Sequence, residues 1–271
     1  MSRHPSYVII GGGTTGCILA AKLSEDPAAQ VVLLEEGPSD RNPWIRFPGT
    51  YYKTCQGPLL KRYPWDSAAE LARAPGDTMI QASVLGGGSS INGMVYARGN
   101  PGDYDDWARS GATGWGYADV LPYYRRSEDN SDFCNEAHGM GGPMGISFNN
   151  LVLPLTRKWL QACQQAGFAF NPDFNSGNPG GCGYYQIAAR NGRRTSSTSA
   201  YLNPALHRSN LQVITGAKVL RIVIEQGRAV GVQYSRGSQV LTGRAEREVI
   251  VSAGAINSPK LLMLSGVGDA N

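Results

Sequence analysis

The sequence is poor in cysteine and contains no long apolar run, and both absences exclude classes of protein. Its five cysteines are odd in number, widely spaced and form no Cys-x-x-Cys pair. We therefore expect no disulfide framework and no bound metal, and we predict a cytoplasmic protein. No apolar stretch approaches the ~18 residues of a membrane-spanning helix. No apolar segment precedes the first expected strand, so we also expect no signal peptide.

Charge of one sign is not in excess either. Lys and Arg number 25 against 21 Asp and Glu, a formal net charge of +4, and the basic doublets are Arg125-Arg126 and Arg193-Arg194. Nucleic-acid binding requires a basic stripe or patch, so we expect no nucleic-acid partner. A small molecule is the expected partner.

Histidine, the residue best suited to acid–base work near neutral pH, is scarce. The three histidines are His4, His138 and His207. None lies in a motif typical of a catalytic base, so we interpret each as structural or exposed.

Glycine, by contrast, is abundant, with 35 residues in 271. That exceeds the usual ~7% of globular proteins. The glycines cluster at a few points instead of forming a low-complexity tract, which indicates backbone that approaches a ligand closely.

The first cluster lies in a predicted strand–turn–helix–strand unit. Tyr7-Val8-Ile9-Ile10 is a short apolar run typical of a buried parallel strand, and 31–34 is a second one. Between them, Gly11-x-Gly13-x-x-Gly16 opens a predicted helix over 17–24, in which Cys17 acts as a small buried hydrophobe. Gly11 permits a tight turn, Gly13 a close approach of pyrophosphate, and Gly16 close helix–strand packing.

This unit predicts a dinucleotide site. Backbone N–H groups near Thr14 and Thr15 would face phosphate at the helix N-terminus. Glu35 follows Gly16 by 19 residues, close to the ~20 expected for the acid that accepts ribose hydroxyls. Glu36 is an alternative acid. The unit by itself does not distinguish NAD from FAD.

A second glycine cluster, Gly86-Gly87-Gly88-Ser89-Ser90, lies within the apolar-flanked stretch 84–99. Such a segment can present several backbone N–H groups to an anion or a flat ring. The alternative is a flexible surface loop, but linkers seldom carry apolar flanks.

With these motifs the chain resembles the glucose–methanol–choline (GMC) oxidoreductases. The resemblance extends over nearly the whole chain and rests on five segments: 12–24, 33–37, 85–94, 103–107 and 254–268. Within the family, sorbose dehydrogenase-like and choline dehydrogenase-like members are the most similar. Two positions depart from the family pattern: Ala82-Ser83 stands where Gly followed by Arg or Lys is common, and Glu36 replaces a usual Ala.

The resemblance implies FAD as the cofactor. It places Val84, Gly86 and Gly87 along the cofactor, and Asn92, Gly93, Met94 and Val95 near the isoalloxazine. It also places the Val219 backbone at the adenine, and Ala253 and Gly254 near the dinucleotide.

The fold class expected is α/β, with a Rossmann-like FAD-binding domain on a parallel sheet and part of a substrate domain built on an antiparallel sheet. We assign 1–37, 76–130 and 205–271 to the FAD-binding domain. We assign 38–75 to a crossover over the cofactor and 131–204 to partial substrate-domain elements.

Several local predictions accompany this assignment. Residues 38–80 should be irregular, with Trp44, Phe47, Tyr51, Tyr52, Tyr63 and Trp65 buried. A helix over 154–167 should bury the stripe Leu155, Trp159, Leu160, Cys163 and Ala166. A hairpin should turn at Gln226-Gly227. A strand should run over 248–253, followed by a helix capped by Ser258 with Pro259 as its first residue.

The resemblance implies oxidation of an alcohol, sugar or polyol by hydride transfer to flavin, with an unspecified electron acceptor. The catalytic base is expected C-terminal to Asn271. The 271 residues alone should bind FAD weakly and turn over no alcohol. The alternatives are a non-catalytic flavin-binding fragment, one chain of a two-chain enzyme, an FAD-containing lyase of the same family, and a NAD-dependent enzyme.

Overall fold

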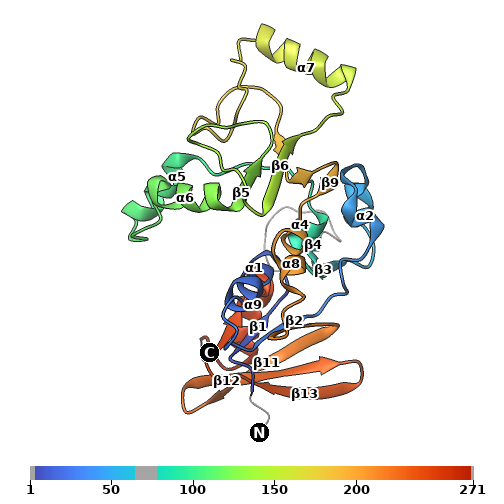
Figure 1. Cartoon of the computed structure of the whole chain (residues 1–271), viewed down its shortest axis with the longest axis vertical. Coiled ribbons are helices and arrows are strands. Elements are labelled where there is room, and N and C mark those ends of the chain that lie inside the picture. The colour runs from blue at the N-terminus through green and yellow to red at the C-terminus, as the bar shows by residue number, and fades with distance from the viewer. Residues whose placement is uncertain (1–3, 65–77, 270–271) are drawn as a thin grey trace. The chain divides into compact units, whose positions relative to one another are not determined.

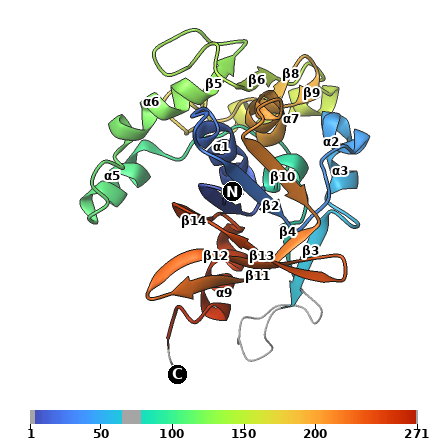
Figure 2. The ribbon, with the colours of Figure 1, turned by 60° about the horizontal axis from the view of Figure 1, so that its bottom comes forward.

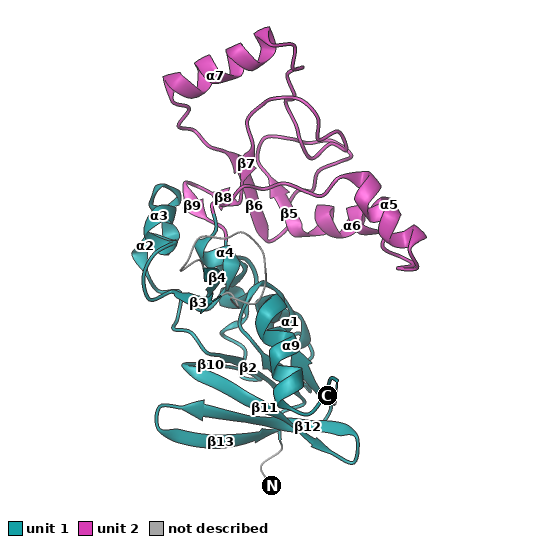
Figure 3. Ribbon diagram, turned by 180° about the vertical axis from the view of Figure 1, so that it is seen from behind, with its two compact units in different colours: residues 1–92, 196–271 teal, residues 93–195 magenta. Residues whose placement is uncertain are grey.

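A computed structural model describes residues 4–64 and 78–269, and the chain divides into two compact units (Figure 3). Unit 1 comprises residues 1–92 and 196–271, and unit 2 comprises 93–195. These boundaries differ from the expected ones: 93–130 belong to unit 2, whereas 38–64 and 196–204 belong to unit 1.

Unit 1 combines a parallel sheet, an antiparallel sheet, a hairpin and several helices (Figure 1). Its helices are α1 (Thr14–Leu23), α2 (Pro43–Arg46), α3 (Tyr51–Thr54), α4 (Gly88–Ile91), α8 (Asn203–Ala205) and α9 (Gly254–Leu264), with the 3-10 turn η1 (Pro48–Thr50) and the π-helix η2 (Thr198–Leu202). Its strands are β1 (Tyr7–Ile10), β2 (Val31–Glu35), β3 (Leu60–Pro64), β4 (Thr78–Ala82), β10 (Leu211–Thr215), β11 (Ala217–Glu225), β12 (Arg228–Arg236), β13 (Gln239–Arg244) and β14 (Glu248–Val251).

The parallel sheet has the strand order β10-β2-β1-β14 (Figure 2). β1 lies at its centre, with Tyr7 opposite both Val31 of β2 and Glu248 of β14. The continuous apolar runs at 7–10 and 31–34 are explained by this position, because both faces of the sheet are covered and all of these side chains are buried or partly buried.

Two hydrophobic cores cover the two faces of this sheet. Val8, Ile10 and Leu34 pack on one face with Ile222, Val232 and Leu261 from β11, β12 and α9. On the other face Ile9, Val31 and Leu33 pack with Cys17 of α1, Leu85 and Leu202. Cys17 is fully buried, as predicted. The layered arrangement confirms the predicted α/β class with a parallel sheet.

The predicted hairpin turn is also confirmed. β11 and β12 pair antiparallel up to Glu225 opposite Arg228. The two residues between them have positive φ, +50° at Gln226 and +78° at Gly227. This is the backbone of a type I′ turn, whose twist matches that of the flanking strands.

The prediction of an irregular segment over 38–80 is wrong for its described part. The short helices α2 and α3 occur there, and β3 pairs antiparallel with β4 from Leu60–Ala82 to Pro64–Thr78. The aromatic side chains predicted to be buried are largely exposed: Trp44 44%, Phe47 51%, Tyr51 47% and Tyr52 54%, whereas Tyr63 is half-buried. Trp65 lies outside the described residues. Periodicity failed here because these elements are four or five residues long.

Unit 2 consists of three helices and short strands (Figure 3). They are α5 (Pro101–Arg109), α6 (Tyr117–Ser127), β5 (Glu128–Asn130), β6 (Met144–Phe148), α7 (Pro154–Gln165), β7 (Gln186–Ile187), β8 (Ala189–Arg190) and β9 (Arg193–Arg194). β6 pairs parallel with β5 and antiparallel with β7, and β8 pairs antiparallel with β9.

The centre of unit 2 is ionic. Glu128 accepts from Arg98 Nη2 at 2.5 Å and contacts Nδ1 of His138 at 2.9 Å. Nε2 of His138 lies 2.9 Å from Oδ2 of Asp173. The side chains of Glu128 and His138 are completely buried. His138 is therefore structural, as expected, because carboxylates occupy both of its ring nitrogens.

The prediction that helix 154–167 buries an apolar stripe is wrong. α7 contains no buried residue, and Leu155 and Trp159 are 79% and 70% exposed. The helix itself is present, and Gly167, with φ +95°, follows its C-terminus as predicted. The stripe therefore lacks a partner within the described part of the chain.

Among the described residues, no helix combines the length and apolar character needed to cross a membrane.

Candidate functional site

The first glycine turn lies at the carboxyl end of β1. Gly11 has φ +96°, and a Cβ on Gly16 would lie 1.9 Å from the Gly11 carbonyl oxygen. Only glycine therefore allows α1 to start so close to the strand. α1 begins at Thr14 without a side-chain cap or an acidic residue in its first turn. Its N-terminal N–H groups carry the positive end of the helix dipole.

The second glycine segment lies directly against the first. The Gly86 N–H donates to the Gly12 carbonyl at 2.7 Å. A Cβ on Gly87, which has φ +55°, would lie 2.8 Å from the Cα of Gly13. The two segments therefore touch backbone to backbone.

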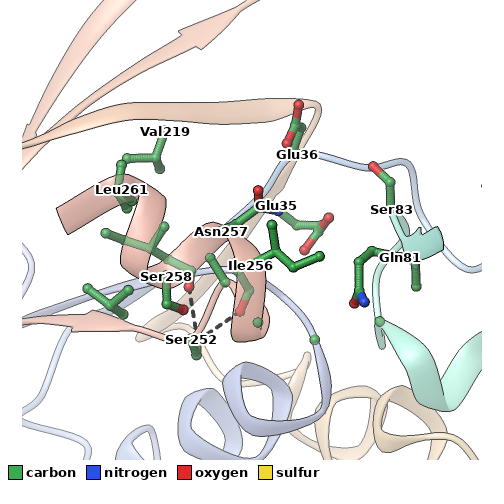
Figure 4. A pocket seen from close by; sticks show the side chains of 18 of the residues that line it. Glu35, Glu36, Gln81, Ser83, Val219, Ser252, Ile256, Asn257, Ser258 and Leu261 are labelled. Carbon is green, nitrogen blue, oxygen red and sulfur yellow. Dashed lines mark hydrogen bonds between the residues drawn. The ribbon is translucent and has the colours of Figure 1, made fainter. Parts of the chain in front are cut away.

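A cavity of about 510 Å³ lies where the two segments meet (Figure 4). Such a volume is typical of small-molecule sites. It opens at the carboxyl ends of β1, β2 and β14, the position at which parallel α/β sheets bind ligands. Ser252 also lines the cavity, and its hydroxyl lies within hydrogen-bond distance, 3.0 Å, of the carbonyl oxygens of both Ile10 and Gly11.

Glu35 lines this cavity at the end of β2 and is held by the backbone. Its Oε2 accepts from the Gly12 N–H and its Oε1 from the Gly37 N–H, both at 2.7 Å. Burial raises the pKa of Glu35 above its ordinary value, and these two N–H groups oppose the rise. The carboxylate therefore has a fixed position, and each oxygen retains a further lone pair.

Glu36, the alternative acid, is placed differently. Lys61 Nζ lies 2.8 Å from its Oε2, and both side chains are about one-third exposed. Glu36 is therefore neutralised by a surface ion pair at the cavity. Lys218 and Lys260 also line the cavity, so among its described residues lysine side chains outnumber carboxylates.

Most of the residues predicted to bind the cofactor line the cavity. They are Gly11, Gly13, Thr14, Thr15, Glu35, Val84, Gly87, Val219, Ala253 and Gly254. Gly16 and Gly86 do not line it but support it from behind.

The remaining predicted residues lie elsewhere. Asn92 is exposed at the end of the first segment of unit 1 and does not line the cavity. Gly93, Met94 and Val95 belong to unit 2, where the Met94 carbonyl accepts from the Ala188 N–H at 2.8 Å. Met94 has φ +64°, an uncommon backbone for a non-glycine residue and one that clusters at functional sites.

The helix after β14 begins five residues earlier than predicted. α9 starts at Gly254, its N-cap is Ala253, and Pro259 lies inside the helix. Ser252 anchors the end of β14 to the glycine turn, and Gly254, with φ +87°, follows two residues later. The chain therefore turns into the helix immediately after the strand, and Ser258 is not its cap.

Sequence patterns did not identify several cavity residues. Lys61 and Gln81 come from the paired strands β3 and β4, and Lys218 precedes Val219 on β11. Asn257 and Ser258 of α9 also line the cavity, although the sequence predicted only a helix cap at Ser258 and no cofactor contact for either residue. Only the pairing of β3 with β4 brings Lys61 to the cavity, and no local signal marks that pairing.

No histidine lines the cavity as described: His4 and His207 are exposed, and His138 is buried in unit 2.

Comparisons with known proteins agree with this geometry. The family model described as GMC oxidoreductase matches residues 6–271. An oxygen-dependent choline dehydrogenase of Sinorhizobium medicae (strain WSM419) is 44% identical over 267 residues, which cover 97% of this chain and 48% of that protein.

Two solved structures are also similar. The pyridoxine 4-oxidase from Mesorbium loti superposes with a TM-score of 0.89 at 32% identity, over 97% of this chain and 52% of that one. An FAD-dependent oxidoreductase from Chaetomium thermophilum gives 0.88 at 30% identity, over 97% and 48%.

The chain spans about half the length of the curated relatives that it matches. Within that half, the family match covers both glycine segments, the acid at position 35 and the return strand with its helix. On the strength of this match and of the fold, the chain belongs to the GMC oxidoreductase family.

Proposed function

We propose that this chain is the FAD-binding N-terminal part of a flavin-dependent enzyme that oxidises the CH–OH group of an alcohol. The observation that supports the proposal is the meeting of two glycine segments around a cavity that contains a backbone-anchored acid, Glu35. The family assignment confirms the prediction that the cofactor is FAD.

The residues around the cavity fit an FAD. The backbone N–H groups at the uncapped N-terminus of α1, at Thr14 and Thr15, would donate hydrogen bonds to the diphosphate. Gly13 and Gly87 both line the cavity and carry no side chain, so both glycine segments would present bare backbone to the diphosphate. Glu35 would accept hydrogen bonds from the ribose hydroxyl groups on its remaining lone pairs.

The adenine end would lie beside Val219, and Ala253 and Gly254 would border the dinucleotide. The departure at Glu36 is compatible with an anionic cofactor, because Lys61 neutralises that carboxylate. The second departure places Ser83 in the cavity where Arg or Lys is common in the family. A cation is still present close by, because Lys61 lies opposite Gln81 on the paired strand β3 and also lines the cavity.

FAD, when bound, accepts a hydride from the carbon that bears the hydroxyl. The work of these residues is then to hold and orient the cofactor. Asn92, Gly93, Met94 and Val95 are proposed to lie beside its ring system. The base that removes the hydroxyl proton is proposed to lie beyond Asn271, because the described cavity contains no histidine.

A choline-like alcohol is the substrate that the relatives favour, since curated proteins more than 40% identical to this chain are named choline dehydrogenases. The sorbose dehydrogenase-like relationship stays a prediction. The cytoplasmic location also stays a prediction, supported by free cysteines in the described chain.

A direct test is equilibrium dialysis of the purified chain against FAD and, in a parallel sample, against NAD. Binding of FAD and no binding of NAD are expected. A protein that binds NAD and not FAD would contradict the proposal.

A further inference from the structure

A chain of buried hydroxyl groups lies behind the second glycine segment, in a part of unit 1 to which no role has been given. The Thr198 hydroxyl donates to Oδ2 of Asp40 at 2.5 Å, a contact between residues 158 positions apart. Thr198 Oγ1 also lies 2.6 Å from Ser196 Oγ. Since the single Thr198 proton goes to the carboxylate, Ser196 donates in that second contact.

Thr198 directly contacts the turn at Gly86. The side chain of Thr198 is fully buried, and a Cβ on Gly86 would lie 3.2 Å from its Cγ2 and 2.2 Å from Ser90 Oγ. Gly86, with φ +87°, therefore fits a slot whose walls are two hydroxyl-bearing side chains.

The neighbouring Ser197 bonds to the same turn. Its N–H donates to Ser89 Oγ at 3.0 Å, and its hydroxyl reaches the Gly86 carbonyl at 3.3 Å. Gly86 in turn donates to Gly12 at 2.7 Å. Hydrogen bonds and packing thus connect the segment anchored by Asp40 to the first glycine turn, on the side away from the cavity.

The local backbone also indicates a constrained position. Thr198 begins η2, a π-helix, which is a rare conformation that occurs frequently near functional sites. None of Asp40, Ser196, Ser197 or Thr198 lines the cavity. Their contribution to ligand binding would therefore act through the glycine turn.

We propose that Asp40 is a positioning residue for FAD: through the Thr198 hydroxyl it holds Gly86 and Gly87 where they close the cavity against Gly12 and Gly13. This inference rests on the proposed function. A hydrogen bond to a charged acceptor is stronger than one to a neutral acceptor, so its loss should loosen the turn measurably.

The test is a double-mutant cycle on FAD affinity, measured by titrating FAD fluorescence with the 271-residue chain. Asp40→Ala and the isosteric Thr198→Val should each weaken FAD binding about tenfold, as expected for one charge-assisted hydrogen bond. The double variant should bind no more than about threefold more weakly than either single one, since both remove the same contact.

Two conservative variants provide the rescue. Asp40→Asn keeps an acceptor oxygen and Thr198→Ser keeps the hydroxyl, so both should bind FAD within about threefold of the unaltered chain. Ser39→Ala, at an exposed neighbour of Asp40, is the matched control and should leave the affinity unchanged.

A second readout separates positioning from general stability. Without FAD, amide hydrogen exchange in Asp40→Ala should rise at residues 85–90 and stay unchanged in β1 and β2. Unchanged FAD affinity in Asp40→Ala, additive losses in the cycle, or faster exchange throughout unit 1 would each overturn the positioning role alone. Failure of the unaltered chain to bind FAD would overturn the proposed function and this inference with it.

Discussion

Glu35 is oriented before any ligand arrives, because two backbone N–H groups hold its two oxygens at 2.7 Å. Such an acceptor does not lose side-chain freedom when it binds a hydroxyl. Preorganisation of this kind improves affinity by reducing the entropic cost of binding. Glu36, one position further on, makes its ion pair with Lys61 at the partly exposed rim.

We predict that Glu35→Gln weakens FAD binding about 10- to 100-fold, the effect of losing hydrogen bonds to a charged group worth about 1.5–3 kcal/mol. The glutamine NH₂ would face a backbone N–H of Gly12 or Gly37, so donor meets donor. Glu36→Gln should change the affinity less than about fivefold, since surface ion pairs contribute about 0–1 kcal/mol. Fluorescence titration measures both, and equal effects would contradict the assignment of Glu35.

His138 is the titratable centre of unit 2. Burial tends to lower its pKa, but the hydrogen bonds to Glu128 and Asp173 outweigh burial and raise it above the ordinary 6.5. Burial likewise tends to raise the pKa of Glu128, and its contacts with His138, Asn130 and Arg98 lower it below 4.5. Two cations and two carboxylates thus balance in the interior.

The pH dependence follows from these signs. The stabilisation from His138 is fully present below pH 6.5 and is lost as the pH rises through its raised folded-state pKa. The stabilisation from Glu128 is present above pH 4.5 and is lost as the pH falls through its lowered pKa. Unit 2 should therefore become less stable on the alkaline side of pH 6.5.

This prediction is tested by proteolysis or hydrogen exchange of segment 93–195 as a function of pH. His138→Gln should be less stable at pH 6 and should lose most of the alkaline decline. The exposed His207→Gln is the control and should retain the decline. A decline that persists unchanged in His138→Gln would assign it to another group.

At the scale of elements, the two glycine segments depend on each other for their conformation. Gly87 adopts φ +55°, and any side chain there would meet Gly13. Neighbouring Gly88 begins α4, and a Cβ there would meet nothing within 4 Å.

We predict that Gly87→Ala lowers the free energy of unfolding of the chain without FAD by about 2–5 kcal/mol, the sum of left-handed strain and overpacking. Gly88→Ala should stay within about 1 kcal/mol of the unaltered chain or gain slightly, because alanine favours a helix. Denaturant unfolding monitored by circular dichroism measures both. Equal stability of the two variants would show that the segments do not touch.

α7 illustrates the limit of pattern-based prediction at this scale. Its apolar spacing correctly predicted a helix, but Leu155 and Trp159 are exposed. Periodicity reports which face of a helix is apolar and contains no information on what covers that face. The same reason explains Trp44 and Phe47, whose size suggested burial that the described chain does not provide.

At the scale of the whole molecule, the described part of the chain contains a glycine-lined cavity without a recognisable base. The described cavity contains backbone N–H groups, Glu35 and lysines, and no histidine. The chain also matches about half of each relative's length.

We predict that the 271-residue polypeptide binds FAD weakly and shows no choline-dependent reduction of an artificial electron acceptor. Loss of a general base alone costs about 10²–10⁴-fold in rate, so any activity should fall below detection. A full-length choline dehydrogenase is the positive control. Robust turnover by the verified 271-residue chain would contradict the prediction and place the base within it.

The sequence by itself determined the strand, the glycine turn, the helix and the acid of the N-terminal segment 7–35. It also determined the turn at Gln226-Gly227. These features depend on backbone sterics and side-chain period over a few neighbouring residues, which a sequence displays directly. Only the tertiary structure decided that Gly86 bonds to Gly12, that Lys61 neutralises Glu36 and that His138 lies between two carboxylates. Each of these contacts joins residues that are separated along the chain and that tertiary folding brings together. A local sequence pattern specifies neither the partner of such a residue nor whether its side chain is buried.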